Sequence, residues 1–367
     1  MAEINTQKMR VLYLMNNANI FGGTPKKTID LLNYFKKFGS IYFYAKNDEF
    51  KQYLKQFEIT QANVLAGNHG WNIYKHLKNL IAHVDENKIQ VIHAQFSMGE
   101  LLSVLVKLFR PNIKVVVSFV LPFSPKGYKR IISNIIYPFV DGFIFVSNYV
   151  KTEKLKQFPK IDYKRNKVIY NGTKKREVKN KIKDHENTCL LDIAGLTNWK
   201  NIDVLVSAMN ILLNERKRTN IKLHIAGDGP EKKRLQILID KLGLSENIKL
   251  LGYQSNIGDL LYWSDIFVHP AYAEAFGIAI PEAMLANKPI IVANAGALPE
   301  LIDNNINGLV VDPYSPNDWA DAIDLIIINK EIANQFANSA YDKASNEFTS
   351  GKFTKNYESF YIDCLNN

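Results

Sequence analysis

Cysteine is almost absent from this sequence. Its 367 residues include two cysteines, Cys189 and Cys364, which provide neither a disulfide framework nor the paired spacing of a zinc site. No run of about 18 uncharged apolar residues is present, so we expect no membrane-spanning helix. The N-terminal residues also lack the apolar region of a secretory signal. Together these absences favour a reducing, cytoplasmic environment.

Signatures of metal binding and nucleic-acid binding are missing as well. No Asp-X-Asp triplet occurs, so the sequence has no obvious acidic motif to bind a divalent metal that coordinates a diphosphate. The histidines are scattered, and we expect His93 and His269, which each close an apolar run, to be packing residues rather than metal ligands. No helix-turn-helix, RNA-binding or zinc-finger pattern is found. We therefore expect no metal, no other cofactor and no nucleic-acid partner.

Basic residues are concentrated in the first half of the chain. Residues 1–175 hold 27 Lys or Arg against 11 Asp or Glu, a net charge of +16, whereas residues 176–367 hold 19 against 25, a net charge of −6. On charge alone, a basic half favours an anionic partner, either nucleic acid, for which no binding motif is present, or an acidic membrane leaflet. Otherwise it is simply a solvated lysine-rich surface. Within it, residues 126–140 combine cations with Tyr and Ile at near-helical spacing. This segment is either a helix that lies on an anionic membrane or an ordinary amphipathic helix packed on its own sheet.

Short apolar runs alternate with amphipathic stretches, and this pattern occurs twice along the chain. Alternation of strands and helices predicts a parallel α/β sheet for each set. The predicted strands are 11–15, 91–94, 115–119 and 143–146 in the first set, and 190–194, 223–226, 248–251, 266–268, 289–292 and 308–311 in the second.

A charged stretch that is poor in apolar residues, 173–188, lies between the two sets and is typical of a linker. We therefore predict an N-terminal domain over 1–172 and a C-terminal domain over 189–348. A C-terminal helix over 349–367 is expected to pack back toward the N-terminal domain. Two doubly wound, Rossmann-like domains form a cleft between them, and ligands bind beyond the carboxyl ends of the strands.

The most informative segment places two carboxylates, Glu274 and Glu282, eight positions apart. The apolar strand 266–270 precedes this segment. Residues 282–286 are predicted to form a helix, and Pro281 is suited to its start. A helix N-terminus beside carboxylates gathers free N–H groups and positive dipole, which suits a ligand with phosphate and sugar hydroxyls. Taken alone, the two glutamates are explained equally well as solvated surface acids.

Other strand-to-helix loops carry glycine or lysine. Gly22 and Gly23 follow the first predicted strand, where they can cradle a phosphate through bare N–H groups or form a plain turn. Lys200 precedes a helix predicted over 204–209, where it can neutralise a diphosphate or be merely solvated. The glycine-rich loop 226–230 is better explained as a structural turn.

The order of several motifs resembles retaining glycosyltransferase family 4, which includes glycogen synthase-like and lipopolysaccharide enzymes. The matching segments are 225–230, 251–253, 274–282, 295–301 and 307–313 in the second half and, more loosely, 21–23, 145–147 and 168–172 in the first. Each motif is weak, but their order and spacing over more than a hundred residues are specific. The resemblance implies the GT-B fold and a nucleotide-sugar donor.

The resemblance also implies roles for individual residues. Glu274 becomes the catalytic carboxylate that faces the transferred sugar, Glu282 holds the ribose hydroxyls, and Lys200 binds the diphosphate. A helix N-terminus and a lysine both stabilise negative charge on a departing nucleoside diphosphate. The remaining donor-binding residues that the resemblance implies are Phe276, Gly277, Ile278, Gly22 and Gly23.

The function implied by the resemblance is transfer of a sugar, with retention, from a nucleotide-diphosphate sugar, with UDP-sugars favoured. Domain 1–172 would take a lipid-linked or saccharide acceptor, in the synthesis of a cell-envelope polysaccharide such as lipopolysaccharide, O-antigen or capsule. The reaction is expected to need no metal. The expected location is the cytoplasm, at the inner face of the plasma membrane if the basic first half binds lipid.

Two departures from the family pattern support an alternative. The family commonly has an arginine soon after Gly195 that partners the lysine on the diphosphate, and here Leu196 takes that place. Loss of one cation there costs on the order of 2–4 kcal/mol of transition-state stabilisation. The histidine that many members carry after the strand ending at Ser118 is missing too. The alternative is a catalytically weak GT-B subunit that acts as a binding partner.

Overall fold

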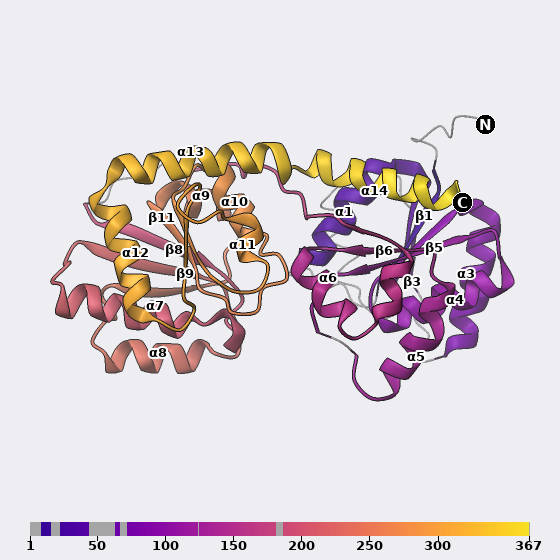
Figure 1. The fold of residues 1–367 in the computed structure, drawn as a ribbon, viewed down its shortest axis with the longest axis horizontal. Coiled ribbons are helices and arrows are strands. Elements are labelled where there is room, and N and C mark those ends of the chain that lie inside the picture. The colour runs from indigo at the N-terminus through magenta and orange to yellow at the C-terminus, as the bar shows by residue number, and fades with distance from the viewer. Residues whose placement is uncertain are drawn as a thin grey trace. The chain divides into compact units, whose positions relative to one another are not determined.

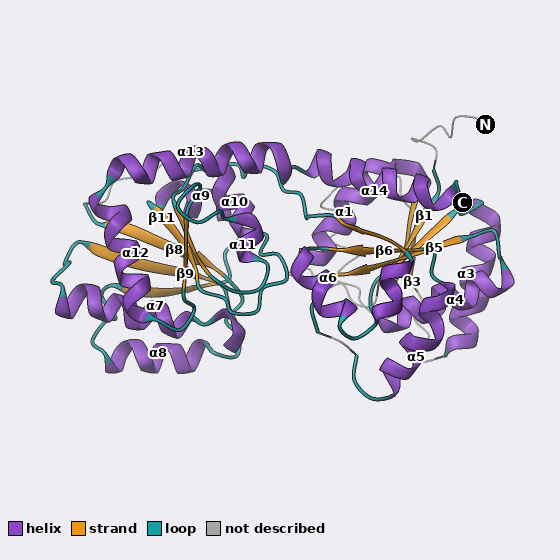
Figure 2. Ribbon diagram, viewed as in Figure 1, coloured by secondary structure: helices purple, strands orange, loops and turns teal. Residues whose placement is uncertain are grey.

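The chain divides into two compact units, and each is described here by itself. The computed structural model describes residues 9–15, 23–43, 63–66, 72–123, 125–180 and 186–366 (Figure 1). One unit comprises Met1–Gly172 together with Ser350–Asn367, and the other comprises Thr173–Thr349. Both are α/β units with a central sheet between helices (Figure 2). Within the described ranges, no helix has both the length and the apolar composition that crossing a membrane requires.

The first unit is built on a parallel sheet whose described strands follow the order β3-β2-β1-β4-β5-β6-β7. The chain runs outward from β1 to β3 and then returns to β4 on the other side of β1, which is the doubly wound arrangement. The apolar runs predicted as strands form its centre, because strands of a parallel sheet are covered by helices on both faces. The strands are β1 Val11–Met15, β2 Gly39–Phe43, β3 Asn63–Ala66, β4 Val91–Ala94, β5 Lys114–Phe119, β6 Gly142–Phe145 and β7 Arg165–Val168.

Helices connect these strands, and short polar side chains cap some of them. The Asn72 side chain accepts from the Lys75 N–H at the start of α3, and the Ser147 side chain accepts from the Val150 N–H at the start of α6. The described helices of this unit are α1 Gly23–Phe35, η2 Lys36–Phe38, α3 Ile73–Asn87, α4 Ser97–Phe109, α5 Tyr128–Ile136, η3 Tyr137–Phe139, α6 Asn148–Leu155, η4 Pro159–Tyr163 and α14 Ser350–Leu365.

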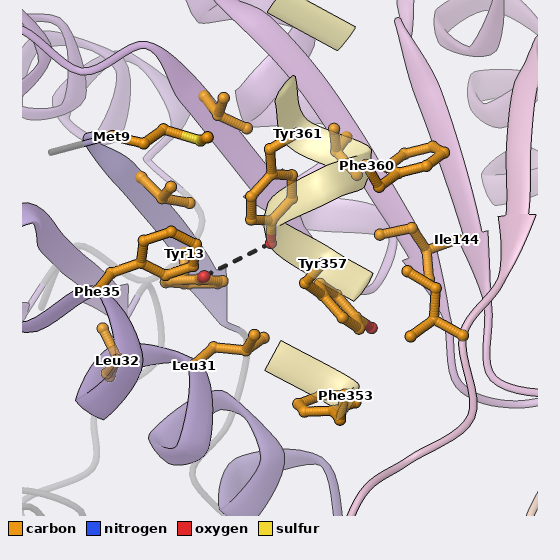
Figure 3. Close-up of a cluster of buried hydrophobic side chains, with 14 of the residues drawn as sticks. Met9, Tyr13, Leu31, Leu32, Phe35, Ile144, Phe353, Tyr357, Phe360 and Tyr361 are labelled. Carbon is orange, nitrogen blue, oxygen red and sulfur yellow. Dashed lines mark hydrogen bonds between the residues drawn. The ribbon is translucent and has the colours of Figure 1, made fainter. Parts of the chain in front are cut away.

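The C-terminal helix α14 belongs to the core of the first unit. Its aromatic face packs against β1 and α1, and the hydroxyls of Tyr361 and Tyr13 lie 3.5 Å apart in the middle of this cluster (Figure 3). His93 links the helix to the sheet, because its Nδ1 is 2.6 Å from the Tyr361 hydroxyl and its Nε2 is 2.6 Å from Ser118 Oγ. His93 is therefore the buried packing residue that was expected, with both ring nitrogens hydrogen-bonded.

The second unit has a parallel sheet whose described strands follow the order β10-β9-β8-β11-β12-β13. Its two central strands, β8 and β11, precede the loops that carry the candidate site. The strands are β8 Thr188–Ile193, β9 Ile221–Ala226, β10 Ile248–Gly252, β11 Ile266–His269, β12 Ile290–Ala293 and β13 Leu309–Val311. The helices are η5 Asn198–Lys200, α7 Ile202–Asn210, η6 Ile211–Glu215, α8 Lys232–Lys241, α9 Ile257–Trp263, α10 Ala279–Leu285, α11 Leu298–Leu301, α12 Pro316–Ile328 and α13 Lys330–Glu347.

The stretch predicted as a linker, 173–188, is held by the second unit at both of its described ends. The Thr173 N–H donates to Phe348 O at 2.7 Å, and the N–H groups of Lys179 and Asn180 donate to one carboxylate oxygen of Asp259. Residues 186–188 lead directly into β8. The start of this stretch is therefore an ordered part of the second unit rather than a free spacer.

Candidate active site

Two neighbouring strands of the second sheet, β8 and β11, end beside each other. They pair in parallel, with Phe267 opposite Leu191, so their carboxyl ends lie at the same edge of the sheet. Asp192 lies near the end of β8, and His269 is the last residue of β11. Ligands of open α/β sheets bind at this edge, so its polar side chains are candidates for function.

Four charged or ionisable side chains form a continuous row at this edge. His269 lies between two carboxylates, with Nδ1 2.8 Å from Asp192 Oδ1 and Nε2 3.2 Å from Glu274 Oε2. Lys200 Nζ donates to the same Glu274 oxygen. The side chains of Asp192 and His269 are 0% and 1% exposed, whereas those of Glu274 and Lys200 are 14% and 16% exposed. The row therefore has a buried end and an accessible end.

These neighbours change the ionisation of Glu274 and His269. Burial raises the pKa of the Glu274 carboxyl, but the Lys200 ammonium and the His269 ring outweigh burial and hold that pKa well below its ordinary value. Burial lowers the pKa of His269, yet the Asp192 and Glu274 carboxylates outweigh burial and raise that pKa. Glu274 is therefore ionised, and protonation of His269 is favoured.

Tertiary contacts position the lysine against the glutamate. Lys200 ends the helical turn η5, and Asn201 follows it in the left-handed region with φ of 54°. The Asn201 side-chain amide donates to the carbonyl oxygens of Pro270 and Pro313, at 3.3 and 2.6 Å. These bonds tie the lysine loop to the loops after β11 and β13. They explain how Lys200 meets Glu274, which lies 74 positions later in the chain.

A tight turn after β12 encloses the backbone of Glu274. Gly296 has φ of +58°, and a Cβ there would stand 2.5 Å from the backbone oxygen of Glu274. The Ala297 N–H donates to that same oxygen at 2.9 Å. Gly277, with φ of +81°, passes close to the glutamate, since a Cβ there would lie 3.1 Å from Glu274 Cγ. The glycines of the two motifs thus allow the backbone to approach and orient the carboxylate.

The second carboxylate, Glu282, lies in a separate ion pair. Its side chain is 4% exposed, Arg176 Nη2 lies 2.5 Å from its Oε1, and Thr173 Oγ1 lies 3.5 Å from the same oxygen. The residues Phe276, Gly277 and Ile278 lead from Glu274 into α10, which carries Glu282. This helix begins at Ala279, three residues before its predicted start. The alternative that Glu274 and Glu282 are solvated surface acids is wrong, because both are largely buried and paired.

Leu196 and the loop 226–230 are structural in this protein. Leu196 is fully buried, its N–H donates to Asp228 O at 3.0 Å, and the Glu231 N–H donates to its oxygen at 3.0 Å. A Cβ at Gly229 would stand 2.3 Å from Leu196 O. The loop after β9 is thus a turn fitted against the loop after β8. The position at which the family pattern implies an arginine is filled here by a core side chain.

Two predicted donor contacts come from the first half of the chain. Gly22 lies outside the described residues, and Gly23 is the first residue of α1 in the first unit. Their approach to a diphosphate stays a prediction. Ser118, after which the family pattern implies a histidine that this chain lacks, is 3% exposed, and its hydroxyl is hydrogen-bonded to His93.

No motif predicts a role for Asp192, and the sequence pattern predicts His269 only as a packing residue. Asp192 is a polar residue at the end of an otherwise apolar strand, and His269 stands five residues before Glu274. Both signals were present but weak, because their meaning depends on the pairing of β8 with β11. Among the described residues, no group of three or more His, Cys, Asp and Glu side chains has the geometry of a metal site.

Two family models match successive parts of the chain. The model described as glycosyltransferase family 4 matches residues 22–175, and the model described as glycosyl transferases group 1 matches residues 173–343. The second match includes all four side chains of the row at the ends of β8 and β11.

Two curated relatives are similar mainly over one half of the chain. N-acetyl-alpha-D-glucosaminyl L-malate synthase of Bacillus anthracis is 27% identical over 48% of this chain and 45% of its own length. Lipopolysaccharide glucosyltransferase WaaG of Escherichia coli K12 is 30% identical over 42% of this chain and 41% of its own length. In both cases the chain matches less than half of the relative's length.

A solved structure is similar over almost the whole chain. Anabaena Alr3699/HepE in complex with UDP superposes with a TM-score of 0.83, covering 97% of this chain and 100% of that chain at 21% sequence identity. At this identity the likeness establishes the fold, which is GT-B, as predicted. With its two family models joined end to end over residues 22–343, the chain belongs to the family 4 glycosyltransferases of GT-B fold.

Proposed function

We propose that this protein is a retaining glycosyltransferase that takes its sugar from a nucleotide-diphosphate donor, with UDP-sugars favoured. The observation that carries the proposal is the paired Lys200 and Glu274 at the accessible end of the row. A cation for the leaving diphosphate and a carboxylate for the sugar stand at the edge where such a sheet binds ligands. Complexes of HepE with UDP and with UDP-glucose support the choice of nucleotide.

The proposed mechanism begins with the opening of the Lys200–Glu274 pair. Lys200 turns to the diphosphate, where one cation contributes about 3 kcal/mol of transition-state stabilisation, and no metal is required for this role. Glu274 then faces the sugar, orients its hydroxyls and stabilises positive charge on the ring as the bond to the diphosphate breaks. The backbone of Phe276, Gly277 and Ile278 contacts sugar and phosphate.

Glu282 is proposed to hold the ribose hydroxyls, and Arg176 sets a condition on that role. Arg176 Nη2 lies 2.5 Å from the carboxylate oxygen Oε1. Ribose hydroxyls must share this carboxylate with the guanidinium or displace it. Glu282 is therefore held in place before the donor arrives, at the cost of a competing ion pair.

The acceptor is proposed to be lipid-linked or saccharide, in the synthesis of a cell-envelope polysaccharide. The name of WaaG, a lipopolysaccharide glucosyltransferase, supports this class of acceptor. A panel of UDP-, GDP- and ADP-sugars, first screened by thermal shift and then offered with lipid-linked acceptors, tests the proposal. The donor should raise the unfolding temperature and be consumed.

Two variants separate the proposed role of Glu274 from a merely structural one. Glu274→Gln keeps the volume and one oxygen but removes the charge, and we expect turnover to fall roughly 10²–10³-fold with little change in fold. Glu274→Ala should lower turnover at least as far. Unchanged turnover in both variants refutes the assigned site. Calorimetric binding of a nucleotide sugar with neither transfer nor slow hydrolysis would instead favour the weakly catalytic subunit.

We also propose that the first unit rests on an anionic bilayer through α5 and the residues beside it. Tyr128, Ile131 and Ile135 lie on one face of α5 and are 64%, 63% and 61% exposed, whereas Ser133 and Ile136 face inward. An ordinary amphipathic helix packed on its own sheet would bury such isoleucines. Further exposed apolar side chains in the adjoining segments are Leu121, Phe123 and Phe139.

The charge of this surface suits anionic lipid. Lys126, Lys129 and Arg130 are exposed, and residues 121–140 contain no Asp or Glu. Three cations near an anionic leaflet contribute about 3 kcal/mol, and inserted isoleucines add to this. The protein should float with vesicles rich in phosphatidylglycerol and not with phosphatidylcholine vesicles, and the double variant Ile131→Ser, Ile135→Ser should lose most of this binding. If the double variant floats as well as the wild type, the proposed membrane-binding surface is wrong.

A further inference from the structure

The buried end of the row, Asp192 and His269, has no place in the proposed function. Neither side chain can touch a donor, since they are 0% and 1% exposed beneath Glu274. Their only route to the chemistry is through the contact of His269 Nε2 with Glu274 Oε2, at 3.2 Å. Any role of these two residues is therefore a positioning role.

Both ring nitrogens of His269 face carboxylate oxygens. An ionised carboxylate only accepts hydrogen bonds, whereas a neutral imidazole donates through one nitrogen and accepts through the other. A neutral ring would thus leave one of its nitrogens facing an acceptor, while an imidazolium satisfies both contacts. The contacts at 2.8 Å to Asp192 and 3.2 Å to Glu274 are consistent with two donated bonds.

The buried surroundings of the Asp192 carboxylate also favour a positively charged neighbour. Its second oxygen, Oδ2, is buried, and no group within the described part of the chain hydrogen-bonds to it. A buried carboxylate with a single partner is costly unless that partner is charged. The imidazolium of His269 supplies this charge and at the same time offers a proton to Glu274.

Lys200 and His269 bind the same oxygen of Glu274, and they are its two neighbours in the row. If Lys200 moves to a diphosphate, the largely buried Glu274 carboxylate keeps, of its two contacts in the row, only the one with His269. Without that contact, the carboxylate would lose both its orientation and its charge compensation.

We propose that Asp192 and His269 are positioning residues that hold the Glu274 carboxylate in place and ionised while Lys200 moves to the diphosphate of the donor. Asp192 orients the ring through Nδ1, and the ring orients the glutamate through Nε2. No proton is transferred in this step, because the imidazolium keeps both of its protons. The first half of this proposal, that Asp192 and a protonated His269 hold Glu274, concerns the free protein. The second half, that Lys200 moves to the diphosphate, rests on the proposed function.

The free protein tests the first half without any substrate. Histidine labelled with ¹⁵N in the full chain is titrated by NMR, and the His269 signals are assigned by their loss in His269→Gln. In the wild type, both ring nitrogens should be protonated at a pH above 6.5, the ordinary pKa of histidine. Asp192→Asn should lower the midpoint by about one pH unit or more, and Lys200→Met should raise it, because Glu274 then has a single cationic partner.

A carboxylate outside the row serves as the control for this titration. Asp203→Asn removes one negative charge from the same unit, at a carboxylate that pairs with Arg234, and should leave His269 unchanged. A singly protonated ring at neutral pH, or a midpoint that Asp192→Asn does not move, overturns the proposal. If Asp192→Asn does not fold, the ring protonation of the wild type and the shift in Lys200→Met still decide it.

UDP serves as the probe for the second half. When UDP binds the wild type, as calorimetry shows, the His269 midpoint should rise as Lys200 leaves Glu274. In Lys200→Met the same addition should produce a smaller rise. Binding of UDP with no change at His269 overturns the movement of Lys200. Absence of UDP binding contradicts the proposed donor and leaves the result of the free-protein titration standing on its own.

Discussion

The Lys200→Met variant tests how much the ion pair at the accessible end of the row contributes to the second unit. Methionine keeps the length of the side chain and removes its charge. Both partners are about 15% exposed, so the pair is far more buried than surface pairs, which contribute about 0–1 kcal/mol. Removal of one partner from a fully buried pair costs about 3–5 kcal/mol. Because His269 still contacts Glu274, we expect an intermediate loss of about 2 kcal/mol.

The pH dependence of this loss follows from the depressed pKa of Glu274. A carboxyl group with a lowered pKa in the folded state stabilises that state above its ordinary pKa of 4.5, and this contribution disappears as the pH falls toward the folded-state value. Lys200 is the largest of the influences that lower this pKa, so the variant keeps less of the contribution. The difference between wild type and Lys200→Met should thus be full at pH 7 and shrink below about pH 4.

Urea denaturation followed by tryptophan fluorescence measures this difference. Three of the four tryptophans, Trp199, Trp263 and Trp319, lie in the second unit, so their emission reports chiefly on its unfolding. Lys233→Met is the matched control, because Lys233 is an exposed lysine of the same unit. If Lys200→Met and Lys233→Met unfold at the same urea concentration at pH 7, the pair does not stabilise the unit and the reasoning is wrong.

Three further predictions concern the surrounding contacts. Gly296→Ala should destabilise the second unit by about 2 kcal/mol or more and lower turnover, because its Cβ would stand 2.5 Å from Glu274 O, whereas Gly243→Ala shares a positive φ (+69°) without the clash and should cost less in the same denaturation assay. Arg176→Met should cost roughly 1.5–3 kcal/mol in urea denaturation, because a carboxylate that is 4% exposed loses a charged partner. Burial lowers the pKa of His93 to about 3, so the unfolded chain alone takes up this proton between about pH 6.5 and 3. Stability should therefore fall with acid by up to about 1.4 kcal/mol per pH unit in that window, and a thermal unfolding series in which His93→Gln shows the same slope would contradict this.

Local patterns in the chain were sufficient to predict most of the central strands. Runs such as residues 115–117 and Ile290–Ala293 are apolar throughout, because helices cover both faces of a parallel sheet. The strand β7, Arg165–Val168, was missed because it reads Arg-Asn-Lys-Val and is only partly buried. Such a strand at the margin of a sheet forms through its backbone bonds to β6 and has no hydrophobic signature of its own.

The candidate site was predictable only where its residues belong to one local pattern in the sequence. Glu274 and Glu282 belong to one short segment whose composition and order carry a signal. Asp192 and His269 became meaningful only through the pairing of β8 with β11, and the contact of Lys200 with Glu274 spans 74 positions. The sequence could identify Leu196 as a departure, but only the fold shows that its side chain is buried in the core.

By itself, the amino-acid sequence determined the fold class, the two-part organisation, the family and the segment that holds both glutamates. These properties depend on local composition and on motif order, which the chain carries wherever it folds. The tertiary structure alone decided which cation pairs with which carboxylate: Lys200 with Glu274, and Arg176 with Glu282. Charge pairing depends on distance in space, and residues from separate loops come within reach only when parallel strands bring their carboxyl ends to one edge of the sheet.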